Sequence, residues 1–437
     1  MGKWYLAPLA LAVHMYALNR TEKKALSILV FAITFNALLL HWTSIYVGSL
    51  PWIILTLGLA LLYLPLILTK RWGIASYPLL FVFAEEIRNR FPFGGFGWGR
   101  VAYSQANAPY AKIAAYGGAI ALSALTILFA FFIFMLAHKH FRPMILLPIL
   151  LLLVPINITE NSQTNVLMVQ GNVPQYGLDF NSRATKVFFN HVAETDKALA
   201  ANRNIDFILW PENAVDVDPF KNKLVTSELN KYKLPLIIGA IVDNNGATLN
   251  TSILWRKSKQ EVYVKQRLTP FGEYIPLRSL AKKISPLVNQ VNDFSPGNQS
   301  KIFTVGKAKI APVICYELID DSILENASRT SNILAVQTNS ATFGKSAESA
   351  QQLSISRIRA IEHARNIVSV STTGYSAVIN YTGDIVQKTS MGTAGHIVAS
   401  VGLINGQSPR DRLGDWAGIF TLIWLILVSR RTPVIRR

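Results

Sequence analysis

Residues 311–317 read Ala311-Pro312-Val313-Ile314-Cys315-Tyr316-Glu317 and contain the single cysteine of the 437-residue chain. The apolar run that ends at the cysteine is typical of a buried strand, and a polar, acidic pair follows it directly. A thiol at the point where a strand breaks into a loop is well placed to act as a nucleophile. Because a lone cysteine is often only a small buried hydrophobe, the interpretation depends on its partners.

The composition indicates that part of the chain lies in a lipid bilayer. Hydrophobic residues make up 51% of the sequence and charged residues 16%, which is too apolar for an ordinary soluble enzyme of this length. The net charge of +18 comes from Lys and Arg scattered through short loops and the tail, so nucleic-acid binding is not expected. One cysteine excludes an internal disulfide, and the sequence has no Cys/His cluster at zinc spacing, so no metal or other cofactor is expected.

Seven apolar runs predict an α-helical, polytopic membrane domain. Several runs are shorter than the roughly 20 residues that a perpendicular membrane helix needs, so their ends must extend into the flanks or the bilayer must thin locally. A buried core helix would explain any single run, but six in succession favour a membrane domain. The runs are residues 4–18, 25–40, 53–68, 74–84, 113–136, 144–156 and 416–428.

The charges of the connecting loops orient this membrane domain. Basic loops that include Lys24, Lys70 and Lys139 alternate with a connection at residues 43–51 that has no Lys or Arg. If the basic loops are cytoplasmic, the segment between the sixth and seventh runs lies on the extracytoplasmic side. Met1 then starts outside as well, which favours a further helix upstream of this sequence.

Residues 85–112 are expected to form a long loop on the same side as the large domain. Glycines alternate with aromatic residues between positions 91 and 100, which suits either a re-entrant loop or an interfacial anchor. The apolar runs themselves carry few ionisable residues, with His14 as the main exception. That scarcity argues against a transporter.

Residues 157–413 change to alternating strand and helix signals, which predict one α/β domain. The chain is therefore divided into a membrane domain of about six helices at residues 1–156, this domain at 157–413, and a last membrane helix with a basic cytoplasmic tail at 414–437. The predicted strands are residues 166–170, 207–210, 236–241, 252–255, 310–315, 333–337 and 367–371, and the predicted helices are residues 182–201 and 349–365.

Three stretches at predicted strand ends carry candidate catalytic groups. Glu212 follows a buried strand and Pro211, Lys265 ends another strand, and Cys315 ends a third. A loop rich in Pro and Gly after Lys265 carries a second carboxylate, Glu273. Strand ends in α/β folds bring distant side chains to one crevice, although Glu212 or Lys265 taken singly would more often be a solvated surface charge.

The order Glu212, Lys265, Cys315 resembles that of the nitrilase superfamily, also called the carbon-nitrogen hydrolases, and most closely its membrane-bound branch, the apolipoprotein N-acyltransferase family. The resemblance extends over nearly the whole chain and implies an αββα sandwich for the large domain. The motifs that carry it are Gln170-Gly171-Asn172-Val173-Pro174, Trp210-Pro211-Glu212, Asn250-Thr251, Pro270-Phe271-Gly272-Glu273-Tyr274, Cys315-Tyr316-Glu317, Thr338-Asn339 with Phe343-Gly344, and Arg359-Ala360-Ile361-Glu362 with Arg365.

The chemistry of these groups assigns three roles. A thiol with a pKa of about 8.5 is mostly protonated at neutral pH, so a carboxylate must take its proton before it attacks an ester; Glu212 is the expected general base. Lys265 is expected to stabilise the oxyanion of the tetrahedral intermediate. The resemblance further implies that Glu273 holds Lys265 or Glu212 in place.

The resemblance also implies a pocket and a reaction. Tyr316, Glu317 and Asn339 are the supporting residues that would bind substrate. The acyl donor would be a membrane phospholipid, and the acceptor the α-amino group of an N-terminal diacylglyceryl-cysteine on an apolipoprotein. The enzyme would act as a monomer in the bacterial cytoplasmic membrane.

Two alternatives stay open. The same three residues with water or a small amine as acceptor would make a membrane-tethered amidase or acyl hydrolase. A decayed site would leave a noncatalytic membrane binding or transport protein.

Overall fold

The computed structural model describes residues 2–141, 149–173, 185–279, 282 and 293–431. The chain divides into two compact units. The helical unit comprises Met1–Asn157 and Ser408–Arg437, and the sandwich unit comprises Ile158–Gln407.

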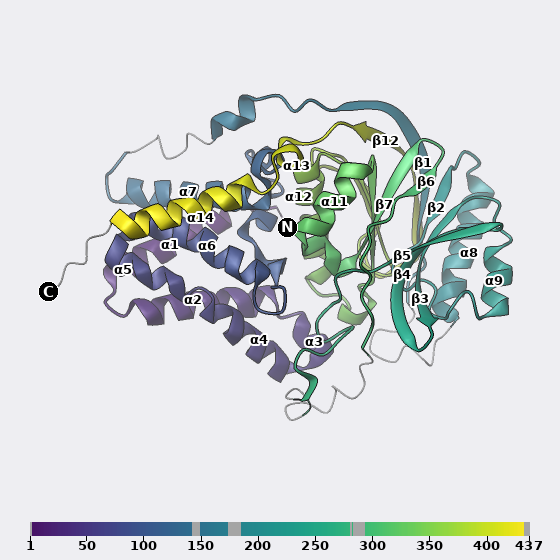
Figure 1. The fold of residues 1–437 in the computed structure, drawn as a ribbon, viewed down its shortest axis with the longest axis horizontal. Helices are drawn as coiled ribbons and strands as arrows, with labels where there is room; N and C mark the ends of the chain where they lie inside the picture. The colour runs from purple at the N-terminus through teal and green to yellow at the C-terminus, as the bar shows by residue number, and fades with distance from the viewer. Residues whose placement is uncertain (1, 142–148, 174–184, 280–281, 283–292, 432–437) are drawn as a thin grey trace. The chain divides into compact units, whose positions relative to one another are not determined.

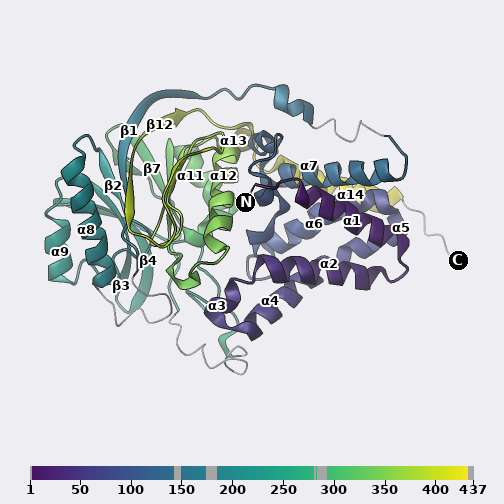
Figure 2. The same ribbon diagram turned by 180° about the vertical axis from the view of Figure 1, so that it is seen from behind.

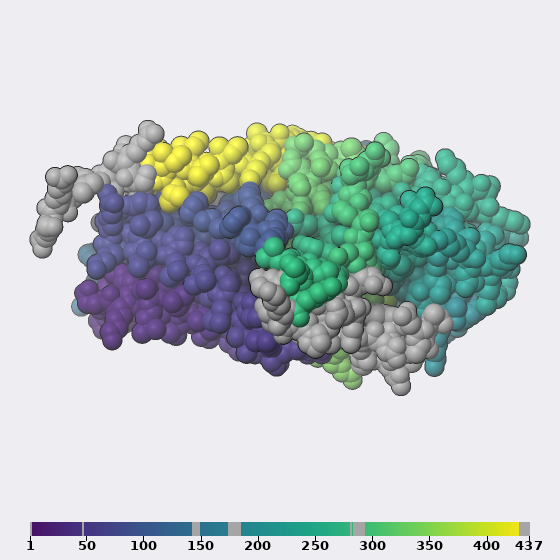
Figure 3. Space-filling model, turned by 60° about the horizontal axis from the view of Figure 1, so that its bottom comes forward, coloured from purple at the N-terminus to yellow at the C-terminus, as the bar shows by residue number. Residues whose placement is uncertain are grey.

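The helical unit is built from α-helices joined by short 3-10 turns. Side chains such as Met15, Ile28 and Phe81 form its buried core. The last helix packs against α6 and α7, and Figure 3 shows it in yellow along the surface of this unit. The helices are α1 (Leu6–Arg20), α2 (Lys24–Leu39), α3 (Thr43–Val47), α4 (Ser49–Leu61), α5 (Thr69–Trp72), α6 (Tyr77–Arg90), α7 (Ala114–Ala137), α13 (Pro409–Leu413) and α14 (Trp416–Arg431).

The outer faces of these helices are strongly apolar. Val13 on α1, Leu38 on α2 and Ile419 on α14 are 69%, 77% and 59% exposed. Two helical stretches, Ser49–Trp72 and Ala111–Ala137, are long and apolar enough to cross a membrane, and Lys24–Leu39 and Trp416–Leu427 are shorter apolar helices. The described residues thus establish a helical N-terminal unit with two candidate membrane spans.

Two expectations about this unit are wrong. The described part of the run at 144–156 is not α-helical: residues 149–153 form a 3-10 segment and 155–158 have no regular secondary structure, while 144–148 lie outside the described residues. The loop expected to begin at Glu85 begins later, because α6 continues to Arg90. Glu85 and Arg88 are consequently buried within the helical unit, in addition to His14.

Backbone hydrogen bonds explain why α6 can bury these charges. Val101 N donates to the Glu85 carboxylate at 2.7 Å, and the Arg88 guanidinium donates to the carbonyl of Gly99 at 3.2 Å. Gly99 has no room for a side chain, since a Cβ there would lie 2.1 Å from Arg88 Nη2. The Gly-rich segment after α6 therefore folds back onto the charged end of that helix.

The sandwich unit contains two sheets. The described strands of the first sheet have the order β12-β1-β2-β3-β4-β5, and those of the second have the order β11-β10-β9-β8-β7-β6. The first comprises β1 (Thr159–Gln170), β2 (Phe207–Leu209), β3 (Leu236–Asn244), β4 (Ala247–Arg256), β5 (Lys259–Val264) and β12 (Gly395–Asn405). The second comprises β6 (Phe303–Val305), β7 (Ala308–Ile314), β8 (Ile333–Thr338), β9 (Ile367–Ser371), β10 (Ala377–Ile379) and β11 (Ile385–Lys388).

Alternation along the strands produces the layers. Val166 and Met168 of β1 point into the core between the two sheets, and Leu167 and Val169 point to the opposite face, as the two-residue period of a strand requires. On that opposite face lie α8 (Lys186–Ala201) and α9 (Lys223–Leu229), while α11 (Asp321–Thr330) and α12 (Glu348–His363) cover the second sheet (Figures 1 and 2). The expected αββα sandwich is therefore confirmed.

Parallel strands place the candidate residues at sheet edges. The strands of each set run parallel to one another: β1, β2 and β3 in the first sheet, and β7, β8 and β9 in the second. The carboxyl ends of the strands in a set therefore lie at the same end of their sheet. Glu212 follows β2, and Cys315 and Asn339 follow β7 and β8. Each sheet thus presents candidate groups where its strands pass into loops.

A buried arginine fixes the segment that follows β7. Arg359 of α12 is fully buried and donates from Nε to the Leu318 carbonyl at 2.9 Å. It also forms ion pairs with Asp321 at 2.8 Å and with Glu362 at 2.6 Å. These contacts join α12 to the short 3-10 helix η9 (Cys315–Ile319) that begins at the candidate nucleophile.

Replacing Arg359 with methionine (R359M) should destabilise the sandwich unit strongly. The substitution leaves the buried Glu362 carboxylate and the buried Leu318 carbonyl without their cation, a change that typically costs about 3–5 kcal/mol. R329M is the matched control, because Arg329 pairs with Glu325 at the surface with its side chain 41% exposed, and such pairs contribute about 1 kcal/mol or less. Thermal unfolding of both purified variants measures the difference, and equal unfolding midpoints would contradict the structural role of Arg359.

Candidate active site

Glu212 is positioned by the chain segment that leaves β2. Trp210 N donates to the Ile237 carbonyl of β3 at 2.8 Å, and Gln337 of the second sheet donates to the Trp210 carbonyl at 2.7 Å. Gly239 of β3 lies directly against this turn, because a Cβ there would lie 2.3 Å from the Pro211 carbonyl and 2.5 Å from Glu212 Cα. Both sheets therefore fix the backbone that carries Glu212, which is 4% exposed.

Lys265 lies between two carboxylates at the end of β5. Its Nζ is 3.2 Å from Glu212 Oε1 and 2.8 Å from Glu273 Oε2. Asn250 of β4 donates to the same two carboxylates, at 2.8 Å to Glu212 and 2.5 Å to Glu273. Glu212, Asn250, Lys265 and Glu273 thus form one buried cluster of charged and polar groups, called the lysine cluster below.

The loop after β5 is shaped around Glu273. Thr269 N donates to Glu273 Oε2 at 2.7 Å, and Phe271 N donates to the Tyr274 carbonyl at 2.7 Å. Phe271 adopts a positive φ of 63°, which the Pro-Phe-Gly-Glu turn accommodates. The turn therefore returns the Glu273 carboxylate to the lysine that starts the loop.

Cys315 occupies a strained position where β7 passes into η9. Its φ is +49°, a left-handed conformation that non-glycine residues rarely adopt and that commonly marks functional sites. It is partly exposed and packs against the core between the two sheets. Its expected role as a nucleophile stays a prediction.

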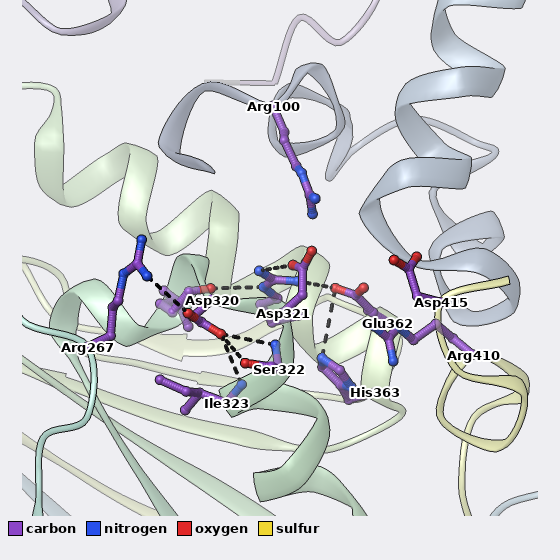
Figure 4. Close-up of polar contacts among 12 residues, drawn as sticks. Arg100, Arg267, Asp320, Asp321, Ser322, Ile323, Glu362, His363, Arg410 and Asp415 are labelled. Atoms are coloured by element: carbon purple, nitrogen blue, oxygen red, sulfur yellow. Dashed lines mark hydrogen bonds and ion pairs between the residues drawn. The ribbon is translucent and has the colours of Figure 1, made fainter. Parts of the chain in front are cut away.

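Glu317 ties the cysteine segment to the lysine segment. Its Oε2 accepts from Ile314 N at 2.7 Å, and its Oε1 accepts from Gln266 N at 2.6 Å and from the Tyr263 hydroxyl at 2.7 Å. A second link joins the same segments, because Arg267 lies 3.8 Å from Asp320 at the start of α11 (Figure 4). One buried carboxylate thus fixes the residue before Cys315 and the residue after Lys265.

Two of the expected supporting residues, Tyr316 and Asn339, lie in the segments that follow β7 and β8. Tyr316 is buried, at 4% exposed. Asn339 accepts hydrogen bonds from Thr372 at 2.7 Å and from Ala341 N at 3.1 Å, so it holds the loop after β8. Their expected roles, and that of Glu317, in binding substrate stay predictions.

The electrostatics of the site leave the thiol protonated at rest. Burial raises the pKa of Cys315 well above its usual value, the Glu212 carboxylate raises it further, and the Lys265 ammonium opposes the shift. Burial alone would lower the pKa of Lys265, but the carboxylates of Glu212 and Glu273 outweigh it and raise that pKa. A charged ammonium therefore lies beside a neutral thiol whose proton must be removed during attack.

Glu317 also carries a shifted pKa. Burial raises it to about 7, although the N–H groups and the tyrosine hydroxyl that it accepts oppose the shift. Among the described residues, no group of three or more His, Cys, Asp and Glu is arranged to hold a metal ion. The groups described here are a thiol, two carboxylates and a buried ammonium, which can act chemically as a nucleophile, a base and an oxyanion donor.

Sequence reasoning missed the roles of two residues in this site. Asn250 was recognised only as part of a motif, and Gln337 only as the end of a predicted strand. Both lie in strands with buried neighbours, where a polar side chain needs a hydrogen-bond partner. That requirement was the available signal, but the sequence could not identify the partners.

Two family profiles match the chain. Residues 1–132 match the apolipoprotein N-acyltransferase N-terminal domain, and residues 156–408 match carbon-nitrogen hydrolase. The chain is 31% identical to an apolipoprotein N-acyltransferase of Mycolicibacterium smegmatis, over 99% of this chain and 83% of that protein. It is 26% identical to an apolipoprotein N-acyltransferase of Photobacterium profundum, over 82% of this chain and 74% of that protein.

Solved structures are similar at lower identity. A member of branch 10 of the nitrilase superfamily from Saccharomyces cerevisiae aligns with a TM-score of 0.42 and 17% identity, over 55% of this chain and 91% of that chain.

Substituting alanine for Gly239 (G239A) should displace Glu212 and lower activity. The new Cβ would collide with the backbone of Pro211 and Glu212, so β3 or the Glu212 turn must move. We expect an activity loss of about tenfold or more, because small displacements of a catalytic group are costly. Turnover and the unfolding midpoint measure the effect.

G395A is the matched control, since Gly395 of β12 has no atom within 4 Å of its Cβ position and needs no positive φ. It should retain the activity and midpoint of the unsubstituted protein. Full activity in G239A would show that the close approach does not position Glu212.

Proposed function

The chain belongs to the apolipoprotein N-acyltransferase family and is an N-acyltransferase of lipoprotein maturation, and we propose that it carries the acyl group as a thioester on Cys315. The acyl donor in this proposal is a membrane phospholipid. The acceptor is the α-amino group of the N-terminal diacylglyceryl-cysteine of an apolipoprotein.

The observation that carries the proposal is the lysine cluster, whose charges act on the Cys315 thiol. An ammonium group has three N–H donors. Two are occupied by Glu212 and Glu273 at 3.2 and 2.8 Å, and the third meets, within the described ranges, the Thr269 hydroxyl at 3.4 Å. That weakly bound third N–H is the one available to an oxyanion.

In the first half-reaction, Glu212 removes the proton from the Cys315 thiol. Among the described residues, both hydrogen bonds to this carboxylate go to Oε1, which leaves Oε2 for the proton. Sulfur attacks the ester carbonyl carbon, and Lys265 stabilises the oxyanion. When the carbon–oxygen bond breaks, the leaving alkoxide takes the proton back from Glu212, giving a thioester and a lysophospholipid.

In the second half-reaction, the neutral amine of the acceptor attacks the thioester carbonyl. Glu212 accepts the N–H proton as the carbon–nitrogen bond forms. The carbon–sulfur bond then breaks, and the proton on Glu212 returns to the thiolate. The products are an amide and the free thiol, so one carboxylate serves both halves.

A membrane location for the helical unit is supported by its apolar outer faces. Exposed side chains such as Leu38 and Ile419 would be costly to leave in water over so large an area. We propose a polytopic membrane domain at residues 1–156, a catalytic domain at 157–413 and a final membrane helix at 414–437. Loop charges favour the extracytoplasmic side of the cytoplasmic membrane for the catalytic domain, and we expect a monomer.

This arrangement has a kinetic advantage. Both substrates carry fatty chains and lie in the same bilayer. A catalytic domain tethered to that bilayer meets them at high effective concentration. In the same proposal Glu273 orients Lys265, while Tyr316, Glu317 and Asn339 shape the pocket.

Incubation with phospholipid should increase the mass of the protein by one acyl chain, mapped to Cys315. C315A should show no adduct, and K265M should form it about 10²–10³-fold more slowly, since it lacks the oxyanion donor. K257M, at an exposed turn, is the control and should match the unsubstituted protein. Intact-mass measurement with time gives the rates.

Adding a diacylated lipopeptide to the acyl-enzyme should yield N-acylated peptide and free thiol. Free fatty acid without N-acylated peptide would indicate the amidase or acyl hydrolase alternative. An adduct on another residue, or none in the unsubstituted protein, would contradict the thioester mechanism.

Cysteine labelling tests the proposed orientation. In a C315A background, Lys231→Cys places a thiol on the sandwich unit at a side chain that is 64% exposed, and Lys70→Cys places one at an exposed position of α5, near the end of the candidate span Ser49–Trp72. A membrane-impermeant maleimide should label K231C in intact spheroplasts and K70C only after lysis. The reverse pattern would place the catalytic domain in the cytoplasm.

A further inference from the structure

Helix α12 contributes a side chain that contacts the nucleophilic sulfur. Gln352 Nε2 donates to Cys315 Sγ at 3.7 Å, within the range for a hydrogen bond to sulfur. Gln352 is 4% exposed and lies in the second turn of α12, whose later turns are anchored by buried Arg359. The amide is therefore held at the sulfur by a rigid element, and the mechanism above gives it no role.

The same face of α12 carries a second buried group. Glu348 lies four residues before Gln352, which places both on one side of the helix, and Glu348 is 2% exposed. Its Oε2 has no hydrogen-bond partner among the described residues. Burial raises the pKa of Glu348 to about 8, Ser340 opposes that shift, and Glu212 adds to it.

Gln352 and Glu348 together determine the electrostatic potential that α12 produces at the Cys315 sulfur. An ionised Glu348 would raise the pKa of the Cys315 thiol, as Glu212 and Glu273 do. At neutral pH Glu348 is mostly uncharged, so the helix presents the Gln352 donor without an opposing carboxylate. Lys265 is the cation that acts on the thiol from the opposite loop.

We propose that Gln352 is a further catalytic residue that stabilises negative charge on the Cys315 sulfur in both half-reactions. An amide N–H cannot be ionised, so it favours the thiolate without competing with Glu212 for the thiol proton. A hydrogen bond to a charged acceptor is worth more than one to a neutral acceptor. The contact therefore strengthens as charge develops on sulfur.

The proposal deepens the proposed function and rests on its thioester mechanism. In the first half, Glu212 takes the proton from sulfur, and Gln352 supports the transient thiolate until the carbon–sulfur bond forms. In the second half, that bond breaks with its electron pair on sulfur. Gln352 then supports the leaving thiolate until Glu212 returns the proton.

Alkylation of Cys315 by iodoacetamide tests the contact without any lipid. Q352L should alkylate about ten- to a hundredfold more slowly than the unsubstituted protein between pH 7 and 8.5, the loss expected for a hydrogen bond to a charged group. Its rate should also reach half-maximum at higher pH. Q351L, at the half-buried neighbouring glutamine, should alkylate at the unsubstituted rate.

A third variant distinguishes loss of the hydrogen bond to sulfur from a change in side-chain packing. Q352H keeps a ring N–H of similar reach and should stay within a few-fold of the unsubstituted rate. E348Q removes the ionisable neighbour and should increase alkylation above pH 8, where Glu348 would otherwise be charged. Unfolding midpoints of all four variants confirm that each is folded.

Equal alkylation rates in Q352L and the unsubstituted protein would overturn the proposal, as would equal slowing in Q352L and Q351L. Slow alkylation in Q352L with normal rates in Q351L and Q352H would support it. Because no acyl donor is used, these results stand even if acylation of a lipopeptide fails. Failure of acylation would instead contradict the proposed function.

Discussion

The structure depends on one ammonium group kept charged in a buried place. Lys265 is 1% exposed, and burying an isolated charge costs several kcal/mol. The two carboxylates at 3.2 and 2.8 Å compensate that cost, and Asn250 bridges the same carboxylates. Because two carboxylates surround one ammonium, the excess negative charge raises the pKa of Lys265 and keeps it charged in contact with the expected base.

The chain segments that carry Glu212, Lys265 and Cys315 must lie close together. Separate buried side chains hold each of these segments in place. Gln337 crosses from the second sheet to hold the Trp210 carbonyl before Glu212. Glu317 joins the segments that carry Lys265 and Cys315. Arg359 fixes the 3-10 helix after Cys315 to α12. The rigidity of the site therefore comes from buried polar side chains that do not themselves react, a role that preorganised active sites need.

The sequence predicted the parts of the fold where pattern and burial agree. Strands such as 166–170 and 333–337 are apolar runs that end in a glutamine, and they form the last part of β1 and most of β8. The prediction failed for β11, whose four residues are exposed, and for β12, whose alternation is interrupted by glycine and polar residues. It also failed at Glu85, where the backbone N–H of Val101, 16 residues later, makes a buried carboxylate tolerable. Partners that are far apart in sequence are invisible to local patterns.

The site residues divide in the same way, into those that a local pattern predicts and those that depend on distant partners. Glu212, Lys265 and Cys315 were found because each interrupts an apolar strand at its end and because their order resembles a family. Asn250 and Gln352 were not assigned roles, since each is one polar residue within an ordinary strand or helix. Their importance depends on what faces them across the site.

The central claim is that Lys265 binds the oxyanion while Glu212 handles the proton. An experimental structure of the acyl thioester that the unsubstituted protein forms with a phospholipid donor, in the absence of an acceptor amine, tests this most directly. We predict electron density for an acyl chain on Cys315 with its carbonyl oxygen within about 3 Å of Lys265 Nζ, the distance of a charge-assisted hydrogen bond. A carbonyl oxygen directed away from Lys265, toward other donors, would contradict the account.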